Sequence, residues 1–556
     1  MNLFKTALFF LLILSFSCNH SLGQVSVKVK QSSLNKISNE LTGVSIRAIS
    51  NNKYLSLKGK VNILLAIDYD ERVKKLKGDG FIIKNLQDGL ILISGRSVRA
   101  TRNGVNFFAE KFLGAYYLLP GDGWTEYNRP QQNINDKNII IVSEPSFYMR
   151  YLSPLDMSKE NEYSIWAIRN NLNHIVDYKH NLYNLFDYQD ASKYSPIIKG
   201  KKKVRSSQTD QLWQPKFNES GIVNYSSNRI LKYFKDNPNS NSFSLSINDS
   251  QNFDDNTQQN GINFLGMKNY SSEYYKWVNE TVTEVNKKLN TTKQFGVLAY
   301  NNVITPPNFK LQKNILPFIT YERYRWLKPK QKQFDLDNLK SWLKVSNNVG
   351  WYDYVYGINY LAPRSYFELI SSYLKEGNSL GVKYYVAELY PNPLDGPKAW
   401  ILSKLLWDVN LNVDILLKQW CELAVGKGSS ESLYKFYKLW EGYWTNQAIK
   451  SNWYRDDAVY QRFNDQSYVR SIPNEYLQQS QILLNEVLKF ADDDSHRRRA
   501  QEFMDYWAIS SETIKYFKND SRNTKDKNAI LKLLNKLPES RMNSEYKIYF
   551  KKHTKL

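Results

Sequence analysis

The sequence predicts a mixed α/β protein in three parts: a small N-terminal α/β domain, a central (β/α)8 TIM-like barrel and a C-terminal helical region. The chain has 556 residues, which is enough for three or four domains. Up to about residue 410 short apolar runs alternate with turns or helical stretches, and beyond it the apolar spacing is helical almost throughout. With 42% hydrophobic residues the chain can bury a large core, so wholesale disorder is excluded.

Residues 1–23 are predicted to be a secretory signal peptide. Lys5 precedes an apolar run that is too short to span a bilayer and is followed by small residues. Cleavage after Gly23 is the favoured route, and lipidation of Cys18 is the alternative. No other apolar stretch reaches the roughly 18 residues that a transmembrane helix needs. We therefore expect a secreted, periplasmic or cell-surface protein without a transmembrane helix.

Residues 25–142 are predicted to form the N-terminal α/β domain. Apolar runs at 61–67 and 89–95 lie between turn residues, as strands do. After Gly104 the aromatic residues recur at helical spacing, which predicts a helix that ends before Gly114.

Residues 143–410 are predicted to form the barrel, the domain expected to carry the chemistry. About eight strands separated by helices fit parallel pairing, and the poorly patterned stretch 205–225 has room for one of them. In such a barrel the side chains at the carboxyl ends of the strands converge on one mouth. The strand candidates are 147–152, 173–178, 243–248, 294–300, 315–321, 351–358 and 383–389.

Residues 411–520 are predicted to form a helical region packed on the barrel, because Leu477, Leu484 and Leu488 share one helix face. The lysine-rich segment 521–556 is expected to be a frayed basic tail.

Charge and motifs exclude several functions. The net charge of +22 attracts polyanions, but the lysines are dispersed along the chain, so nucleic acid is not expected as a partner. No nucleotide-binding glycine motif and no paired-histidine zinc motif occurs, so we predict neither a cofactor nor a metal. Cys421 follows an apolar helical pattern and is expected to be an inert buried thiol. No oligomeric state is predicted.

Several segments carry a resemblance to a known family. Residues 93–95, 102–114 and 117–121 look like the N-terminal domain of α-glucuronidases, and 143–150 and 395–408 resemble the start of their barrel and the helix after its last strand. The pattern is most similar to secreted bacterial proteins that join this N-terminal domain to a barrel of unassigned activity. The likeness covers roughly residues 60–515 and implies a glycoside hydrolase-like architecture.

Three short motifs of that group recur here as His180-Asn181, Asn248-Asp249 and residues 495–499. Members often carry cysteines shortly after the Asn-Asp pair, whereas the stretch after Asp249 has none. A metal or disulfide at that loop is therefore not expected.

Acidic residues end three of the predicted strands. Glycosidic cleavage generally uses two carboxyl groups, one protonated and one ionised. Asp249 and Glu388 are the favoured catalytic pair because their sequence contexts predict the least exposure, and Glu322 is the reserve because Arg323 or Arg325 is available to pair with it. The competing interpretation for each is a helix-capping or surface carboxylate.

A second set of residues is predicted to bind substrate. His180 and Asn181 offer hydrogen bonds to sugar hydroxyls, although a structural histidine is as reasonable. Aromatic faces near strand ends either stack on sugar rings or fill the core. Arg150, Arg323 and Arg325 are suited to bind a uronate carboxylate. The aromatic candidates are Tyr300, Trp351, Tyr354, Tyr356 and Tyr390.

These observations lead to a functional hypothesis. The chain is expected to hydrolyse glycosidic bonds of a polysaccharide or oligosaccharide, including uronic-acid-containing ones, through a carboxylate pair. The alternative is a non-catalytic glycan-binding protein on the same barrel.

Overall fold

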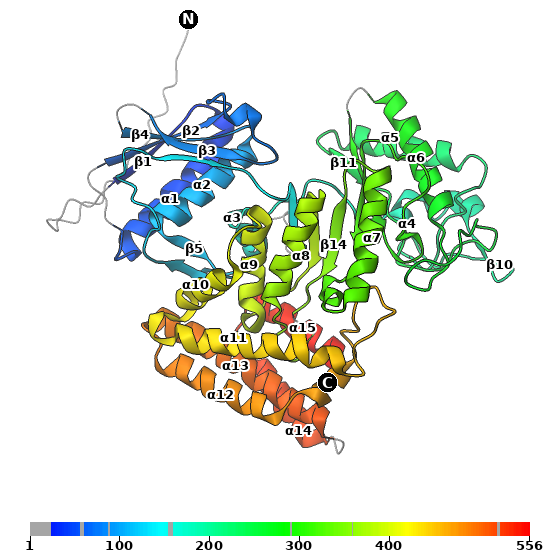
Figure 1. The fold of residues 1–556 in the computed structure, drawn as a ribbon. Coiled ribbons are helices and arrows are strands. Elements are labelled where there is room, and N and C mark those ends of the chain that lie inside the picture. The colour runs from blue at the N-terminus through cyan, green and yellow to red at the C-terminus, as the bar shows by residue number, and fades with distance from the viewer. Residues whose placement is uncertain are drawn as a thin grey trace, which may run out of the picture.

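The computed structural model describes residues 24–55, 60–86, 89–153, 160–289, 292–357, 360–519 and 523–556. The predicted signal peptide, with Lys5 and Cys18, lies outside the described residues. Within the described ranges, no helix has the length and apolarity needed to cross a membrane. The N-terminal α/β part, the central sheet with its helices and the C-terminal helices follow one another from top left to bottom in Figure 1.

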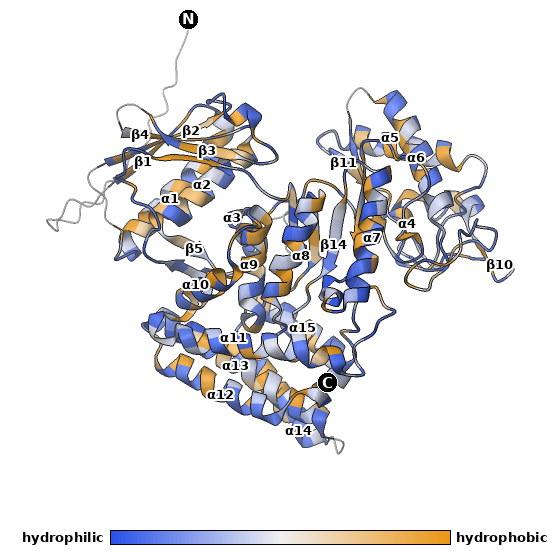
Figure 2. Ribbon diagram, viewed as in Figure 1, coloured by the Kyte–Doolittle hydropathy of each residue, from blue (hydrophilic) through white to orange (hydrophobic). Residues whose placement is uncertain are grey.

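The N-terminal part is a five-stranded sheet in the order β1-β2-β4-β3-β7, in which β1, β2 and β4 are parallel and β3 and β7 antiparallel to their neighbours. The predicted strands at 61–67 and 89–95 are confirmed as β2 and β4, which colour largely hydrophobic in Figure 2. The strands are β1 (Gln24–Val29), β2 (Lys60–Ile67), β3 (Phe81–Asn85), β4 (Leu90–Gly95) and β7 (Ile140–Ser143).

Helices α1 (Asn35–Asn51) and α2 (Val98–Leu113) pack on this sheet. The sequence signals predicted the C-terminal half of α2, and α1 was not predicted. Ser97 caps α2 by accepting a hydrogen bond from the Ala100 amide. Gly114 ends it with a φ of 65°, and a Cβ there would lie 1.9 Å from the Asn128 carbonyl oxygen, so the turn requires glycine. The short hairpin β5 (Ala115–Tyr117) and β6 (Thr125–Tyr127) follows.

The central part is a curled, six-stranded sheet in the order β11-β12-β13-β14-β15-β8, and all five pairings are parallel. Helices lie between most successive strands, as in a barrel. The strands are β8 (Met149–Ser153), β11 (Ser242–Ser244), β12 (Gln294–Ala299), β13 (Ile315–Thr320), β14 (Gly350–Tyr354) and β15 (Tyr384–Glu388). The helices of this part are α3 (Glu162–Arg169), α4 (Leu182–Leu185), α5 (Ile222–Asp236), α6 (Ser271–Lys288), α7 (Pro329–Val345), α8 (Phe367–Leu380) and α9 (Gly396–Trp407).

The prediction of a closed (β/α)8 barrel is wrong, because in the described part of the chain no ladder joins β8 to β11. The candidate strand 173–178 makes a single bridge, between Asn173 and Arg150, and no strand forms within 205–225. In place of a ladder, alternate serine side chains of β11 and the residues just after it form hydrogen bonds with residues 178 and 179. The Ser244 and Ser246 hydroxyls donate to the Lys179 and Tyr178 carbonyls, each at 2.5 Å. Side chains thus occupy the positions where backbone pairing would close the barrel.

The C-terminal part is helical, as predicted, but the expected frayed tail is wrong. Beyond residue 523 the chain forms two further helices, and α15 packs its buried Met542, Tyr546 and Phe550 against the rest of the protein. In Figure 2 the ribbons of these helices carry both hydrophobic and hydrophilic residues, and neighbouring helices pack on one another. The helices are α10 (Val413–Val425), α11 (Lys427–Asn446), α12 (Asn474–Lys489), α13 (Asp494–Lys518), α14 (Thr524–Lys536) and α15 (Arg541–Thr554).

Candidate active site

A cavity of about 490 Å³, here called the mouth cavity, lies at the carboxyl ends of the central strands. This is the edge of a parallel barrel-like sheet at which active sites are generally built. Residues 447–473, between α11 and α12, supply part of its wall. The cavity is lined by Ser153, Tyr178, Lys179, His180, Tyr183, Gln211, Asp249, Leu298, Tyr300, Thr320, Tyr352, Tyr354, Tyr356, Glu388, Tyr390, Tyr460 and Phe463.

Glu388 ends β15 and is partly buried in this cavity. The Tyr352 hydroxyl donates to its Oε1 at 2.5 Å and the Tyr356 hydroxyl donates to its Oε2 at 2.7 Å. Burial raises the pKa of Glu388, the two tyrosine donors and His180 oppose that rise, and the charge of Asp249 adds to it. The net result is a carboxyl group whose pKa lies above its ordinary value, held in one orientation by two hydrogen bonds.

Asp249 lines the same cavity, five residues after the end of β11. Its side chain is exposed, so the predicted sheltered context for Asp249 is wrong: the chain has left the sheet by this point. The Tyr300 hydroxyl donates to Asp249 Oδ1 at a long 3.4 Å. Since Asp249 raises the pKa of Glu388, the two carboxyl groups sense each other electrostatically. The structure therefore brings the two favoured acidic residues together, one partly buried and one open to solvent.

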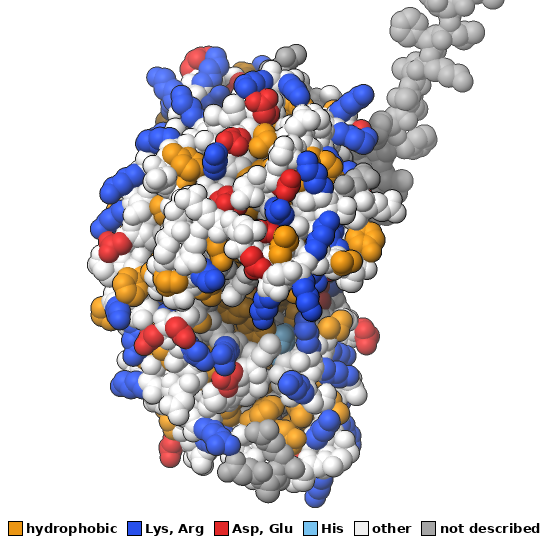
Figure 3. Space-filling view, turned by 90° about the vertical axis from the view of Figure 1, so that its right-hand side faces the viewer, with side chains coloured by type: hydrophobic (Ala, Val, Ile, Leu, Met, Phe, Trp, Pro, Cys, Tyr) orange, Lys and Arg blue, Asp and Glu red, His pale blue; other side chains and the backbone are white. Residues whose placement is uncertain are grey.

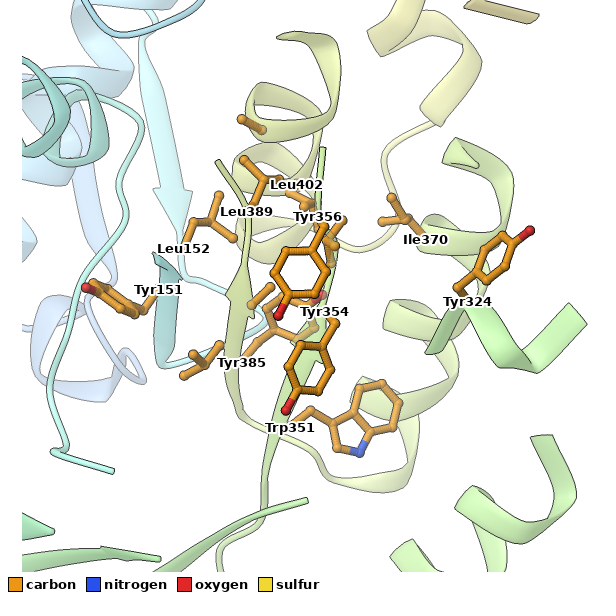
Figure 4. Close-up of a cluster of buried hydrophobic side chains, with 14 of the residues drawn as sticks. Tyr151, Leu152, Tyr324, Trp351, Tyr354, Tyr356, Ile370, Tyr385, Leu389 and Leu402 are labelled. Atoms are coloured by element: carbon orange, nitrogen blue, oxygen red, sulfur yellow. The ribbon is translucent and has the colours of Figure 1, made fainter. Parts of the chain in front are cut away.

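Aromatic side chains make most of the cavity wall. Tyr354 and Tyr356 lie one after the other along the chain leaving β14, with ring centroids 5.6 Å apart (Figure 4). Tyr356 and Tyr390 are stacked with an interplanar angle of 11°. Tyr460 approaches Tyr354 at 4.6 Å between centroids. Rings of this kind offer flat apolar faces with hydroxyls at their edges, a surface that suits a sugar ring.

His180 and Asn181, predicted together, have different roles. His180 lines the mouth cavity, its Nδ1 lies 2.5 Å from the Ile247 carbonyl oxygen, and its ring is 5.9 Å from that of Tyr300. Asn181 is not part of the mouth-cavity lining. Its amide donates to the Ser244 carbonyl and its Oδ1 accepts from Asn184, so it fixes the backbone beside His180.

Trp351 and Arg150 do not reach the cavity, contrary to their prediction as substrate-binding residues. Side chains alternate across a strand, so Trp351 faces the helices while Tyr352 and Tyr354 face the cavity. Trp351 is fully buried between Trp326 and Tyr373. Arg150 is fully buried too: it pairs with Asp79 at 3.2 Å and donates to backbone carbonyls, and burial lowers its pKa to about 10. Arg150 links the N-terminal part to β8.

Glu322, the reserve catalytic residue, is fully buried outside the mouth cavity. It forms an ion pair with Arg364 and accepts a hydrogen bond from the Gln461 amide. The expected partners are wrong, because Arg323 pairs with Asp335 at 3.3 Å and Arg325 donates to the Asp456 carbonyl. Glu322 therefore anchors the wall segment around residue 461 to the end of β13.

Several cavity residues were missed from the predicted site. Tyr352 was missed although it stands at alternate positions with the predicted Tyr354 and Tyr356, and this period of two was a readable signal for one strand face. Tyr460 and Phe463 had no such signal, since they come from a loop more than 60 residues after the last strand.

The described residues contain no cluster of three or more His, Cys, Asp or Glu side chains that could hold a metal ion. Cys421 is fully buried and burial raises its pKa well above the ordinary value, which fits the predicted inert thiol. On the face shown in Figure 3, lysine and arginine are interspersed with acidic and uncharged side chains.

Comparison with known proteins gives a family and a set of structural neighbours. The family model described as "Domain of unknown function (DUF4838)" matches residues 123–438. The chain has no match among curated protein sequences.

Three solved structures show a similar fold. One is described as a novel family GH115 4-O-methyl-alpha-glucuronidase, BtGH115A, with specificity for decorated arabinogalactans; at 12% identity and a TM-score of 0.59 the match covers 96% of this chain and 79% of that one. A second, described as a GH138 enzyme targeting pectin rhamnogalacturonan II, matches with 12% identity, a TM-score of 0.51 and coverages of 96% and 74%. The third is a family 89 glycoside hydrolase from Clostridium perfringens in complex with PUGNAc, with 10% identity, a TM-score of 0.54 and coverages of 90% and 65%. All three are glycoside hydrolases, and at these identities the likeness shows a shared fold.

Proposed function

This chain belongs to the DUF4838 family, and we propose that it hydrolyses a glycosidic bond in a polysaccharide or oligosaccharide. The observation that carries the proposal is the pair of carboxyl groups in the mouth cavity. Glu388 is partly buried with a raised pKa, and Asp249 is exposed. Two carboxyl groups with different environments across one aromatic-lined cavity are what glycosidic cleavage needs. The shared fold with glycoside hydrolases supports the proposal.

In the proposed reaction Glu388 is the proton donor. Its raised pKa keeps a fraction of the group protonated, and the proton passes to the glycosidic oxygen as the bond from that oxygen to the sugar carbon breaks. Asp249 acts on the opposite side of the ring. It takes a proton from the attacking water in a single displacement, or attacks the carbon itself and is released by water in a double displacement. The separation of the two carboxyl groups distinguishes these routes.

The substrate is proposed to be held by the cavity walls. Tyr300, Tyr354 and Tyr390 offer ring faces and hydroxyls, and His180 offers an imidazole edge beside Glu388. Tyr352 and Tyr356 orient the Glu388 carboxyl group and moderate its pKa.

The finer parts of the proposal concern architecture and location. We propose that 25–142 is an α-glucuronidase-like N-terminal domain, that 143–410 is the catalytic domain and that 411–520 is its helical support. Placing the protein outside the cytoplasm rests on the predicted signal peptide and on the carbohydrate-active fold, and an α-glucuronidase-like specificity rests on the motif resemblance.

The test compares single substitutions of the two acids. Glu388→Gln and Asp249→Asn are assayed for sugar release from a panel of neutral and acidic glycans, with Asp337→Asn on the exposed face of α7 as the charge-matched control. Each site variant is expected to lose roughly 10²- to 10⁴-fold in rate, and the control to keep its rate. Full activity in both site variants would remove the assignment. Tight glycan binding by the wild type without turnover would instead support the non-catalytic glycan-binding alternative.

A further inference from the structure

A second cavity of about 510 Å³, here called the side cavity, adjoins the mouth cavity. The two share Lys179, His180 and Tyr183 in their linings, so one short stretch of chain forms the wall between them. The mechanism proposed above uses none of the residues that are unique to the side cavity.

The side cavity exists because the sheet is open between β8 and β11. Where a closed barrel would place further strands, residues 177–181 are tied to the β11 segment through serine side chains. The space beside this stretch is floored by Phe243 of β11 and Tyr233 of α5. Such a floor gives an apolar face of the kind on which a sugar ring packs.

The rim of the side cavity carries two cations. Lys179 is exposed, and Arg229 of α5 is partly buried. Arg229 donates a long hydrogen bond of 3.4 Å to the Asn184 carbonyl and lies 3.9 Å from Asp187, so donors of its guanidinium group remain for another acceptor. The one acidic residue of the lining, Asp177, accepts from the Ser242 hydroxyl and lies 3.9 Å from His174. Among the residues that line the cavity, the two cations outnumber the single carboxylate, and Asp187, which lies near Arg229, is outside the lining.

We propose that the side cavity binds a second, acidic sugar unit of the same glycan that the mouth cavity receives, with its carboxylate held between Lys179 and Arg229. This inference rests on the proposed function, because it takes a saccharide to be the occupant of the mouth cavity. The glycan crosses the shared wall at His180 and Tyr183. Substrate preference for an acidic unit thus comes from outside the catalytic carboxyl pair.

The test measures binding rather than turnover, so that it is separate from the fate of the proposed hydrolysis. The full chain carrying Glu388→Gln is applied to an array in which each uronic-acid-containing oligosaccharide is paired with its carboxyl-reduced form. Affinities for the best acidic member and its reduced partner are then measured by calorimetry. Lys179→Met and Arg229→Met are added singly, and Lys235→Met, an exposed cation on α5 that lines neither cavity, is the matched control.

Acidic members are expected to bind more tightly than their reduced partners. Each rim variant is expected to weaken the acidic member by about five- to tenfold, to leave the reduced partner unchanged, and to lessen the salt dependence of binding; Lys235→Met changes none of these. Equal affinity for acidic and reduced members, binding to neither, or rim variants that behave like Lys235→Met would overturn the inference. Selective acidic binding by a wild-type protein without turnover would sustain it while removing the hydrolase proposal.

Discussion

The tyrosine donors on Glu388 give the sharpest physical prediction. Tyr356→Phe removes the 2.7 Å hydrogen bond that the Tyr356 hydroxyl donates to Glu388 Oε2. The ionised form of Glu388 loses more stabilisation from this change than the protonated form does. A hydrogen bond to a charged group contributes about 1.5–3 kcal/mol, and one pKa unit corresponds to about 1.4 kcal/mol, so the pKa of Glu388 should rise by about one unit. The sign is fixed because the lost donor stabilised the ionised form.

The assay is a titration of side-chain carboxyl carbons by NMR after labelling of glutamate, with the Glu388 resonance assigned from its disappearance in Glu388→Gln. Tyr354→Phe is the matched control, since it removes a hydroxyl from the same strand face without removing a hydrogen bond to Glu388. If the enzyme is active, the limb of the pH–rate profile that reports Glu388 moves upward with the titration. An unchanged or lowered pKa in Tyr356→Phe, or an equal rise in Tyr354→Phe, would refute the reasoning.

Three further predictions concern stability. The pKa of Glu388 is higher in the folded protein than in the unfolded chain, so its ionised form opposes folding. Relative to the wild type, Glu388→Gln should therefore gain stability as the pH rises from about 4 to about 7. Thermal unfolding at both pH values measures this gain, and a constant difference between the two proteins would contradict it. Glu322→Ala leaves Arg364 buried without its partner and should cost about 3–5 kcal/mol in denaturant unfolding; a loss below about 1 kcal/mol would show that the ion pair is dispensable. Tyr546→Ala in α15 should cost about 3–5 kcal/mol and increase proteolysis of the last helices, whereas a frayed tail would show neither effect.

Much of the central sheet was predictable because its strands are short apolar runs between helices. Six of the seven strand candidates overlap a strand of the structure, and the exception, 173–178, makes only the isolated bridge at Asn173. The failure has a physical basis, since run length and composition report burial and not backbone partners. Hydrogen bonds from Ser244 and Ser246 hold this stretch, and a polar residue in an apolar run does not reveal such a role.

The candidate site was predicted in part. Glu388 lines the mouth cavity as the last residue of β15, and Asp249 reaches the same cavity from the chain that follows β11, because the carboxyl ends of parallel strands share one edge of the sheet. Glu322 also follows a strand, yet it pairs with Arg364. Arg364 is distant in the sequence, so the residues around Glu322 could not predict this pair. Trp351 was assigned to the wrong face of the sheet, because successive residues of a strand face opposite sides: Tyr352 faces the cavity and Trp351 faces away from it. The α15 helix was missed since it belongs to the lysine-rich segment 521–556, while a few buried aromatic residues decide its packing.

The most direct test of the central claim is a crystal structure of Glu388→Gln with a bound oligosaccharide. The expected result is a sugar ring in the mouth cavity between Asp249 and residue 388, with the two side-chain carbonyl carbons roughly 5 to 10 Å apart, the range that the two glycosidase geometries span. A saccharide bound elsewhere on the protein would contradict the claim. So would a separation of the two side chains much larger than about 10 Å, with the sugar ring not lying between them.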